Sequence, residues 1–423
     1  MVRMLAALLL LLAVCAGAFA QPTDRVQAGI AAFNKGDLAG AQENLEEATR
    51  LAPDDANAWL LLAQIYAKRK NQAAAREAAG KAETLGAANP VILQGLANLY
   101  SSLIPDPVKA AAMGARYAER APDDTTAWRR LTAFCLSTGQ PERAIEAGTM
   151  GLKVDHSAAL HGLLGRAYVE RKQWPQAGAE FAEAVKLDPY DEDLHFRLAQ
   201  VYLLQQDWVT AVTVLENARK YFDKSAQIEL AFGVAYYGER EFPKAVAEFL
   251  RTIQLAPEVV QPYVFLGRIL EHAGDRLPEV TARFAEYQAR NPKEPLGYVL
   301  HAKGIIAQLP PGGKPPEAQT ALDLLQQALA LKEDDAEAHY LAGILLERQG
   351  EFAKAATHLE RSIALNGSDP APHFRLARVY ARLGRKEDSE RERELHEKLS
   401  NDVNAPDSRG TVSGPPRSPA PAK

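Results

Sequence analysis

Cysteine is nearly absent from this sequence, which contains only Cys15 and Cys135 among its 423 residues. A chain with two cysteines cannot be a disulfide-rich scaffold, so packing has to hold it together. An excess of positive charge is also lacking, because 49 basic residues stand against 54 acidic ones and the formal net charge is −5. This balance argues against a protein that binds nucleic acid through bulk positive charge. We therefore predict no nucleic-acid partner.

Catalytic and phosphate-binding motifs are also lacking. The sequence has no G-x-S-x-G, no H-E-x-x-H and no G-x-G-x-x-G. The stretch PPGGKPP at residues 310–316 superficially resembles a phosphate loop, but Lys314 is followed by Pro315 instead of Ser or Thr. We therefore predict that the protein is not an enzyme and that it carries no cofactor.

The first twenty residues differ from the rest of the chain. Arg3 precedes an uncharged apolar stretch that ends in Ala18-Phe19-Ala20. A charged start, an apolar middle and small residues at a cleavage site are typical of a secretory signal peptide. We expect export to the periplasm or the exterior, with no stable membrane span after cleavage. The alternatives are an uncleaved anchor and an outer-membrane lipoprotein, because residues 12–15 resemble a lipid-attachment box at Cys15.

A regular period runs through the remaining chain. Tyr168, Tyr202 and Tyr236 recur at one constant interval, and an alanine follows each of them nine positions later. The opening of the repeated unit, W-x2-L-x3-Y, is clearest at residues 59–66. Within each repeat the apolar residues recur at spacings of three and four, which is typical of a helix face.

This pattern and its interval resemble those of the tetratricopeptide repeat family, whose unit is about 34 residues long. The resemblance implies an all-α, right-handed superhelical solenoid of about 11 helix-turn-helix repeats, in which stacked neighbours bury one another's apolar faces. We expect a signal peptide over 1–20, the solenoid over 21–400 and a disordered, proline-rich tail over 401–423. The predicted repeats begin near residues 22, 56, 90, 125, 158, 192, 226, 260, 295, 336 and 370.

Four histidines occupy position four of a repeat, counted from its first residue: His161, His195, His339 and His373. The family prefers a bulky packing residue there, and the four lie in different repeats. Cys135 stands in the tyrosine column and is expected to be a small buried residue. We therefore predict no metal site.

In the resembling family the first helices of the repeats line a concave groove, and positions two, five, nine, twelve and thirteen face inward. Carried onto this chain, these positions hold eight basic and five acidic residues. We expect an extended or helical partner segment there, with apolar anchors and with carboxylates that pair with Arg166, Arg268 or Lys303. The alternative is scattered surface charge with ordinary packing between repeats. The candidate partner-binding residues are Arg166, Phe196, Gln200, Val234, Tyr237, Arg268, Lys303 and Arg378.

These expectations favour an exported, non-catalytic scaffold that binds partner proteins or peptide segments. One alternative is an accessory subunit of an envelope assembly or polysaccharide-export machine. Another is a hydrolase or transferase whose site escapes recognition, although the repeats leave little room for a separate catalytic domain.

Overall fold

The computed structural model describes residues 21–310 and 316–404. Within these ranges there are 22 α-helices and no strand, so the predicted all-α solenoid class is confirmed. The predicted signal peptide and most of the predicted tail lie outside the described residues. The last helix continues to Asn404, and the first four residues of the predicted tail are therefore helical.

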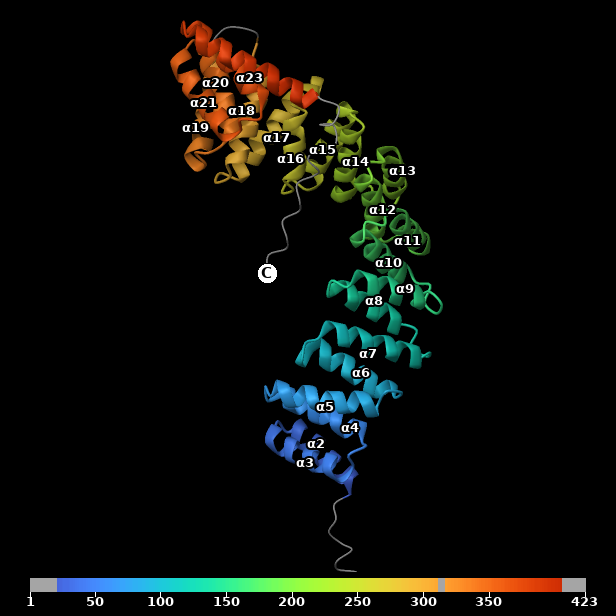
Figure 1. Ribbon diagram of the computed structural model, residues 1–423. Helices are drawn as coiled ribbons and strands as arrows, with labels where there is room; N and C mark the ends of the chain where they lie inside the picture. Colours follow the sequence, from blue (N-terminus) through green and yellow to red (C-terminus); the bar gives the residue numbers. More distant parts are fainter. Residues whose placement is uncertain (1–20, 311–315, 405–423) are drawn as a thin grey trace, which may run out of the picture. The chain divides into compact units, whose positions relative to one another are not determined.

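The described part of the chain forms two compact units, with the boundary between Gln205 and Gln206, and each unit is described by itself. In the first unit, successive helices alternate in direction and stack on one another (Figure 1). Its helices are α2 (Pro22–Asn34), α3 (Leu38–Leu51), α4 (Ala56–Lys68), α5 (Gln72–Leu85), α6 (Pro90–Asn98), the π-helical turn η1 (Leu99–Leu103), α7 (Pro107–Arg120), α8 (Ala127–Ser137), α9 (Pro141–Gly151), α10 (Ala158–Glu170), α11 (Trp174–Leu187) and α12 (Glu192–Leu204).

The second unit continues the same alternation. Its helices are α13 (Trp208–Arg219), α14 (Ala226–Gly238), α15 (Phe242–Leu255), α16 (Gln261–Arg268), the 3-10 turns η2 (Leu270–His272) and η3 (Gly274–Arg276), α17 (Leu277–Arg290), α18 (Pro295–Gln308), α19 (Pro316–Leu331), α20 (Ala336–Gln349), α21 (Phe352–Leu365), α22 (Pro370–Arg382) and α23 (Lys386–Asn404).

Helix pairs are the building blocks of both units. The first helix of a pair packs on the second, as α4 does on α5 and α20 on α21. First helices also contact the first helices of neighbouring pairs, as α8 does with α10 and α18 with α20. Contacts between neighbouring first helices thus occur in both units, at α4 with α6 and α8 with α10 in the first, and at α16 with α18, α18 with α20 and α20 with α22 in the second.

Glycine at position eight allows the two helices of a pair to approach. A Cβ added to Gly165 would lie 2.9 Å from ring atoms of Phe181, and one added to Gly233 would lie 2.5 Å from Cδ1 of Phe249. Both phenylalanines are fully buried, so their rings occupy the space of the missing side chain. Interiors packed at this density leave no room for an extra methyl group.

The turn between the two helices of a pair uses one left-handed residue. Five of these residues are glycines, which adopt a positive φ without steric cost. The other four are long polar residues, for which the left-handed conformation is strained. The left-handed residues are Gly36, Lys70, Gly139, Lys172, Gln206, Arg240, Gly274, Gly350 and Gly384.

The third repeat replaces this left-handed residue by a π-helical turn. Ile104 stands one repeat length after Lys70, and Pro105 follows it. A β-branched side chain disfavours positive φ, and a following proline pushes a residue toward extended backbone. Ile104 has φ −127° and ψ 67°, and its N–H donates to the carbonyl of Leu99, 3.1 Å away. The chain therefore widens at residues 99–104 before α7 begins.

Position four ties a repeat to the turn that precedes it. The hydroxyl of Tyr263 donates to the carbonyl oxygen of Pro257 at 3.0 Å, and the hydroxyl of Tyr298 donates to that of Pro292 at 3.1 Å. The indole N–H of Trp59 makes the same contact with Pro53 at 2.9 Å. Each bond satisfies a carbonyl at the end of the previous helix pair, where no helical partner remains.

Candidate functional site on the first-helix face

We name the surface formed by positions two, five, nine, twelve and thirteen of the first helices the first-helix face. All eight predicted binding residues lie on first helices. Arg166 lies on α10, and Phe196 and Gln200 lie on α12, so these three belong to the first unit; Val234 and Tyr237 lie on α14, Arg268 on α16, Lys303 on α18 and Arg378 on α22, all in the second unit.

Two of the four predicted cations are already paired. Nζ of Lys303 lies 2.5 Å from Oε1 of Glu337, on the next first helix. Nη2 of Arg378 lies 3.2 Å from Oε1 of Glu347, which Arg375 also contacts at 3.2 Å. Glu337 and Glu347 occupy predicted inward positions themselves, so the charges of Lys303 and Arg378 are neutralised within the first-helix face.

Arg166 and Arg268 are the other two cations. Both side chains are exposed, and neither forms an ion pair with a carboxylate in residues 21–310 and 316–404. The guanidinium of Arg268 lies over the ring of Phe265, 5.8 Å from its centroid. Exposed guanidinium groups without an internal acid are suited to bind an external carboxylate.

The predicted apolar anchors are half-buried. The ring of Tyr237 meets Phe265 edge-on, with a centroid separation of 5.2 Å, so Phe265 brings Tyr237 and Arg268 to the same place. Val234 packs against the same apolar cluster. These side chains contribute to packing between repeats and offer only part of their surface to a ligand.

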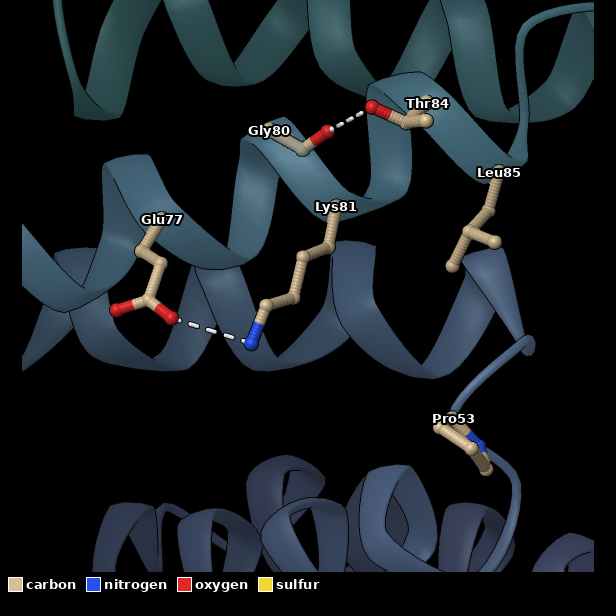
Figure 2. Close-up of a pocket in the computed structure, with 6 residues that line it drawn as sticks. All are labelled: Pro53, Glu77, Gly80, Lys81, Thr84 and Leu85. Atoms are coloured by element: carbon tan, nitrogen blue, oxygen red, sulfur yellow. Dashed lines mark hydrogen bonds and ion pairs between the residues drawn. The ribbon is translucent and has the colours of Figure 1, made fainter.

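A shallow pocket opens beside α5 in the first unit, and Figure 2 shows its lining. Its volume is about 420 Å³. The polar groups in it already have partners, because Nζ of Lys81 lies 3.1 Å from Oε1 of Glu77 and the hydroxyl of Thr84 donates to the carbonyl of Gly80 at 3.0 Å. These internal contacts make it a poor recognition site.

A second pocket lies in the first unit between α6, α7 and α8, and has a volume of about 180 Å³. Its lining includes three outward positions of the first-helix face, Gln94, Asn98 and Ser101. Sequence reasoning missed this pocket because the segment SSLIPDP, residues 101–107, interrupts the repeat pattern there. That interruption was the available signal, since π-helical turns often occur at functional sites.

A buried charged cluster fills the space between α13, α14 and α15. Glu229 at position four is fully buried and ion-paired with Arg219 and with Nε of Arg251, 3.2 Å away. Arg219 also binds Oε2 of Glu248 at 2.7 Å. The pKa of Glu229 is raised to about 6, first by burial and next by its hydrogen bond with the carboxyl group of Glu248.

The four position-four histidines make internal contacts, and no group of three or more His, Cys, Asp or Glu side chains in the described ranges could hold a metal ion. Nδ1 of His161 lies 2.7 Å from Oε2 of Glu180, and Nε2 of His195 lies 3.0 Å from the carbonyl oxygen of Pro189.

The thiol of Cys135 is buried, which raises its pKa to about 11. None of the helices in the described part of the chain combines the length and apolar character of a membrane span.

Comparison with protein-family models identifies the repeats. Models described as tetratricopeptide repeat match residues 26–90, 317–370 and 342–392, and residues 193–225. A model described as TPR repeat matches residues 165–206. The chain thus contains tetratricopeptide repeats near both ends of the described region and in its middle.

Several solved structures are also similar to this chain. The structure of Naa15/Naa10 bound to HypK-THB is 14% identical, covering 88% of this chain and 68% of that chain with a TM-score of 0.48. Yeast Tom70 is 14% identical, and the match covers 91% of this chain and 92% of the Tom70 chain with a TM-score of 0.37. YrrB, a TPR protein with an unusual peptide-binding site, is 18% identical, covering 46% and 97% with a TM-score of 0.37. A comparison with curated proteins found no match.

Proposed function

Because the chain contains tetratricopeptide repeats, we propose that it is a non-catalytic scaffold that binds protein or peptide segments on its first-helix face. Support comes from the contacts between neighbouring first helices within each unit, as between α8 and α10 and between α18 and α20. First helices that contact one another can present side chains from several repeats to one extended ligand. The helices supply rigid positions, so the ligand would meet a surface that is organised before binding.

The observation that carries this proposal is the state of Arg166 and Arg268. Both are exposed on first helices and neither is paired with a carboxylate in the described ranges. Each is therefore expected to bind an acidic group of a partner. Lys303 and Arg378 contribute less than the sequence suggested, because Glu337 and Glu347 already neutralise them.

The experiment is crosslinking in the native organism with identification of the partner, followed by capture of that partner on variants. Arg166→Glu and Arg268→Glu are each expected to weaken capture at least tenfold, because each replaces an attraction by a repulsion. Arg76→Glu is the matched control, since Arg76 is exposed on the second helix α5. If Arg166→Glu and Arg268→Glu both capture the partner as well as the wild type does, the first-helix face is not the binding surface.

We also propose that the protein is exported. The proposal rests on the sequence of residues 1–20, with Arg3, the apolar stretch and Ala18-Phe19-Ala20. Mass spectrometry of the mature protein distinguishes the outcomes. A chain that begins at Gln21 would support cleavage, a lipid on Cys15 would indicate a lipoprotein, and an intact Met1 would contradict both.

A further inference from the structure

The pocket between α6, α7 and α8 is the feature of the first-helix face that the predicted binding residues do not include. Its volume of about 180 Å³ is close to that of a cavity of about 150 Å³ that accommodates a benzene ring. One aliphatic or aromatic side chain therefore fits. The floor and walls carry Ala97, Leu131 and Phe134, so most contacts available to that side chain are apolar.

The pocket offers no free charge. Arg130 is the one ionisable cation in its lining, and Nη2 of Arg130 lies 2.5 Å from Oδ2 of Asp124. The same carboxylate oxygen accepts a hydrogen bond from the hydroxyl of Tyr117 at 2.8 Å. Because Arg130 and Tyr117 are both committed to Asp124, a charged side chain in the pocket would find no counter-ion. An uncharged side chain is complementary to it.

Two carboxamides stand at the rim. Gln94 and Asn98 are exposed and lie four residues apart, hence on the same face of α6. Neither carboxamide has a side-chain hydrogen-bond partner in the described part of the chain. A carboxamide offers a donor and an acceptor together, which matches the N–H and C=O of a peptide unit. An extended segment could therefore cross the rim while one of its side chains enters the pocket.

We propose that this pocket takes one uncharged apolar side chain, of the size of leucine or phenylalanine, from an extended segment of a partner protein whose backbone is bound by Gln94 and Asn98. This inference rests on the proposed peptide-binding function and names its anchor. The π-helical turn widens the chain next to the pocket, where the other described repeats turn sharply at a left-handed residue.

The test uses a phage-displayed library of random dodecapeptides panned on the full-length protein. Enriched peptides are expected to share one Leu, Ile, Met or Phe at a fixed register, flanked by uncharged residues. A synthetic peptide of the enriched sequence is then measured by fluorescence anisotropy. Ala97→Leu, which fills the pocket, is expected to weaken binding at least tenfold, and Gln94→Ala combined with Asn98→Ala at least fivefold.

Matched controls keep these results interpretable. Ala73→Leu adds the same side chain to an exposed position on α5, a second helix outside the pocket and outside the first-helix face, and Gln27→Ala removes an exposed carboxamide from α2; both should leave binding unchanged. Circular dichroism checks that each variant folds. If Ala97→Leu does not fold, Ser101→Leu narrows the rim from an exposed position and replaces it.

The outcomes distinguish a failure of the pocket assignment from a failure of the proposed scaffold function. Enrichment of a charged residue at the fixed position, or equal affinity for wild type and Ala97→Leu, overturns the pocket assignment. If such peptides bind less well to Arg166→Glu or Arg268→Glu, the scaffold function still stands. If the library yields no binding peptide, both the pocket and peptide binding by this face are rejected.

Discussion

Nδ1 of His339 lies 3.0 Å from Nδ1 of His358, on the second helix of the same repeat. Nε2 of His339 lies 3.0 Å from the carbonyl oxygen of Glu333, which can only accept, so Nε2 carries the proton. Nδ1 of His339 is then the acceptor and His358 the donor. A proton added to Nδ1 of His339 would face the proton on Nδ1 of His358, so the contact requires that Nδ1 of His339 carries no proton.

This pair predicts a loss of stability in acid. Burial, and next the neighbouring His339, lowers the pKa of His358 below its usual value of 6.5. A base with a lowered folded-state pKa binds fewer protons in the folded protein than in the unfolded chain. Its contribution to the free energy of unfolding is therefore present above pH 6.5 and is lost as the pH falls below 6.5. His358→Gln should therefore lose less stability between pH 7 and pH 5 than the wild type, by urea denaturation. His156→Gln, at an exposed loop residue, should match the wild type; equal slopes for all three proteins would refute the prediction.

Glu229 has the opposite pH dependence. The folded-state pKa of Glu229, about 6, lies above its usual value of 4.5. Its contribution to the free energy of unfolding is therefore fully present below pH 4.5 and is lost as the pH rises through 6. Between pH 4.5 and pH 7 the wild type should lose about 1–2 kcal/mol of unfolding free energy relative to Glu229→Gln, in which this titration is absent. Hydrogen exchange of α13–α15 against pH is the measurement, and a constant difference between the two proteins would contradict it.

Gly233 should not tolerate a side chain. Gly233→Ala places Cβ 2.5 Å from Cδ1 of the buried Phe249, and overpacking of this kind costs about 1–3 kcal/mol. Gly80→Ala is the matched control, because a Cβ on Gly80 meets nothing within 4 Å inside α5. There alanine should stabilise the helix by up to about 1 kcal/mol. The midpoint temperature of thermal unfolding is the measurement. A midpoint that shifts in the same direction for both variants would rule out this account.

The left-handed turn residues predict gains from glycine. Arg240 has φ 62° and is exposed, so Arg240→Gly should raise the unfolding free energy by about 0.5–1 kcal/mol through relief of backbone strain. Gly350→Ala, at φ 81° with open space around it, should lower it by about 1 kcal/mol. Chemical denaturation of both variants is sufficient. A destabilised Arg240→Gly would show that its side chain matters more than its backbone.

The repeat period predicted the fold class because one physical rule, burial of a helix face against its neighbours, acts identically in every repeat. First helices begin at Pro22, Ala56, Pro90, Ala127, Ala158, Glu192, Ala226, Gln261, Pro295, Ala336 and Pro370. The glycine-rich turn column could also have been read from the sequence, since Gly350 and Gly384 stand one repeat length apart. Its four non-glycine members hide that column from a composition-based search.

The candidate site was less predictable, because it depends on neighbours in space. Nothing in the spacing of Lys303 shows that Glu337 neutralises it, since that contact depends on two flexible side chains on adjacent first helices. The pocket beside α6 arises where Ile104 and Pro105 break the period, and a search for regularity passes over such a place. The binding role of the eight predicted residues remains a prediction.

The burial of Cys135 has a practical consequence. A thiol whose pKa is about 11 is almost entirely protonated at neutral pH, and its sulfur is covered by neighbouring helices. Maleimide reagents should therefore ignore it in the native protein. In a protein that begins at Gln21, and so lacks Cys15, a cysteine engineered at one exposed site in each unit could then carry a donor and an acceptor dye without removal of Cys135. Energy transfer between the dyes would report how the two halves of the array move in solution.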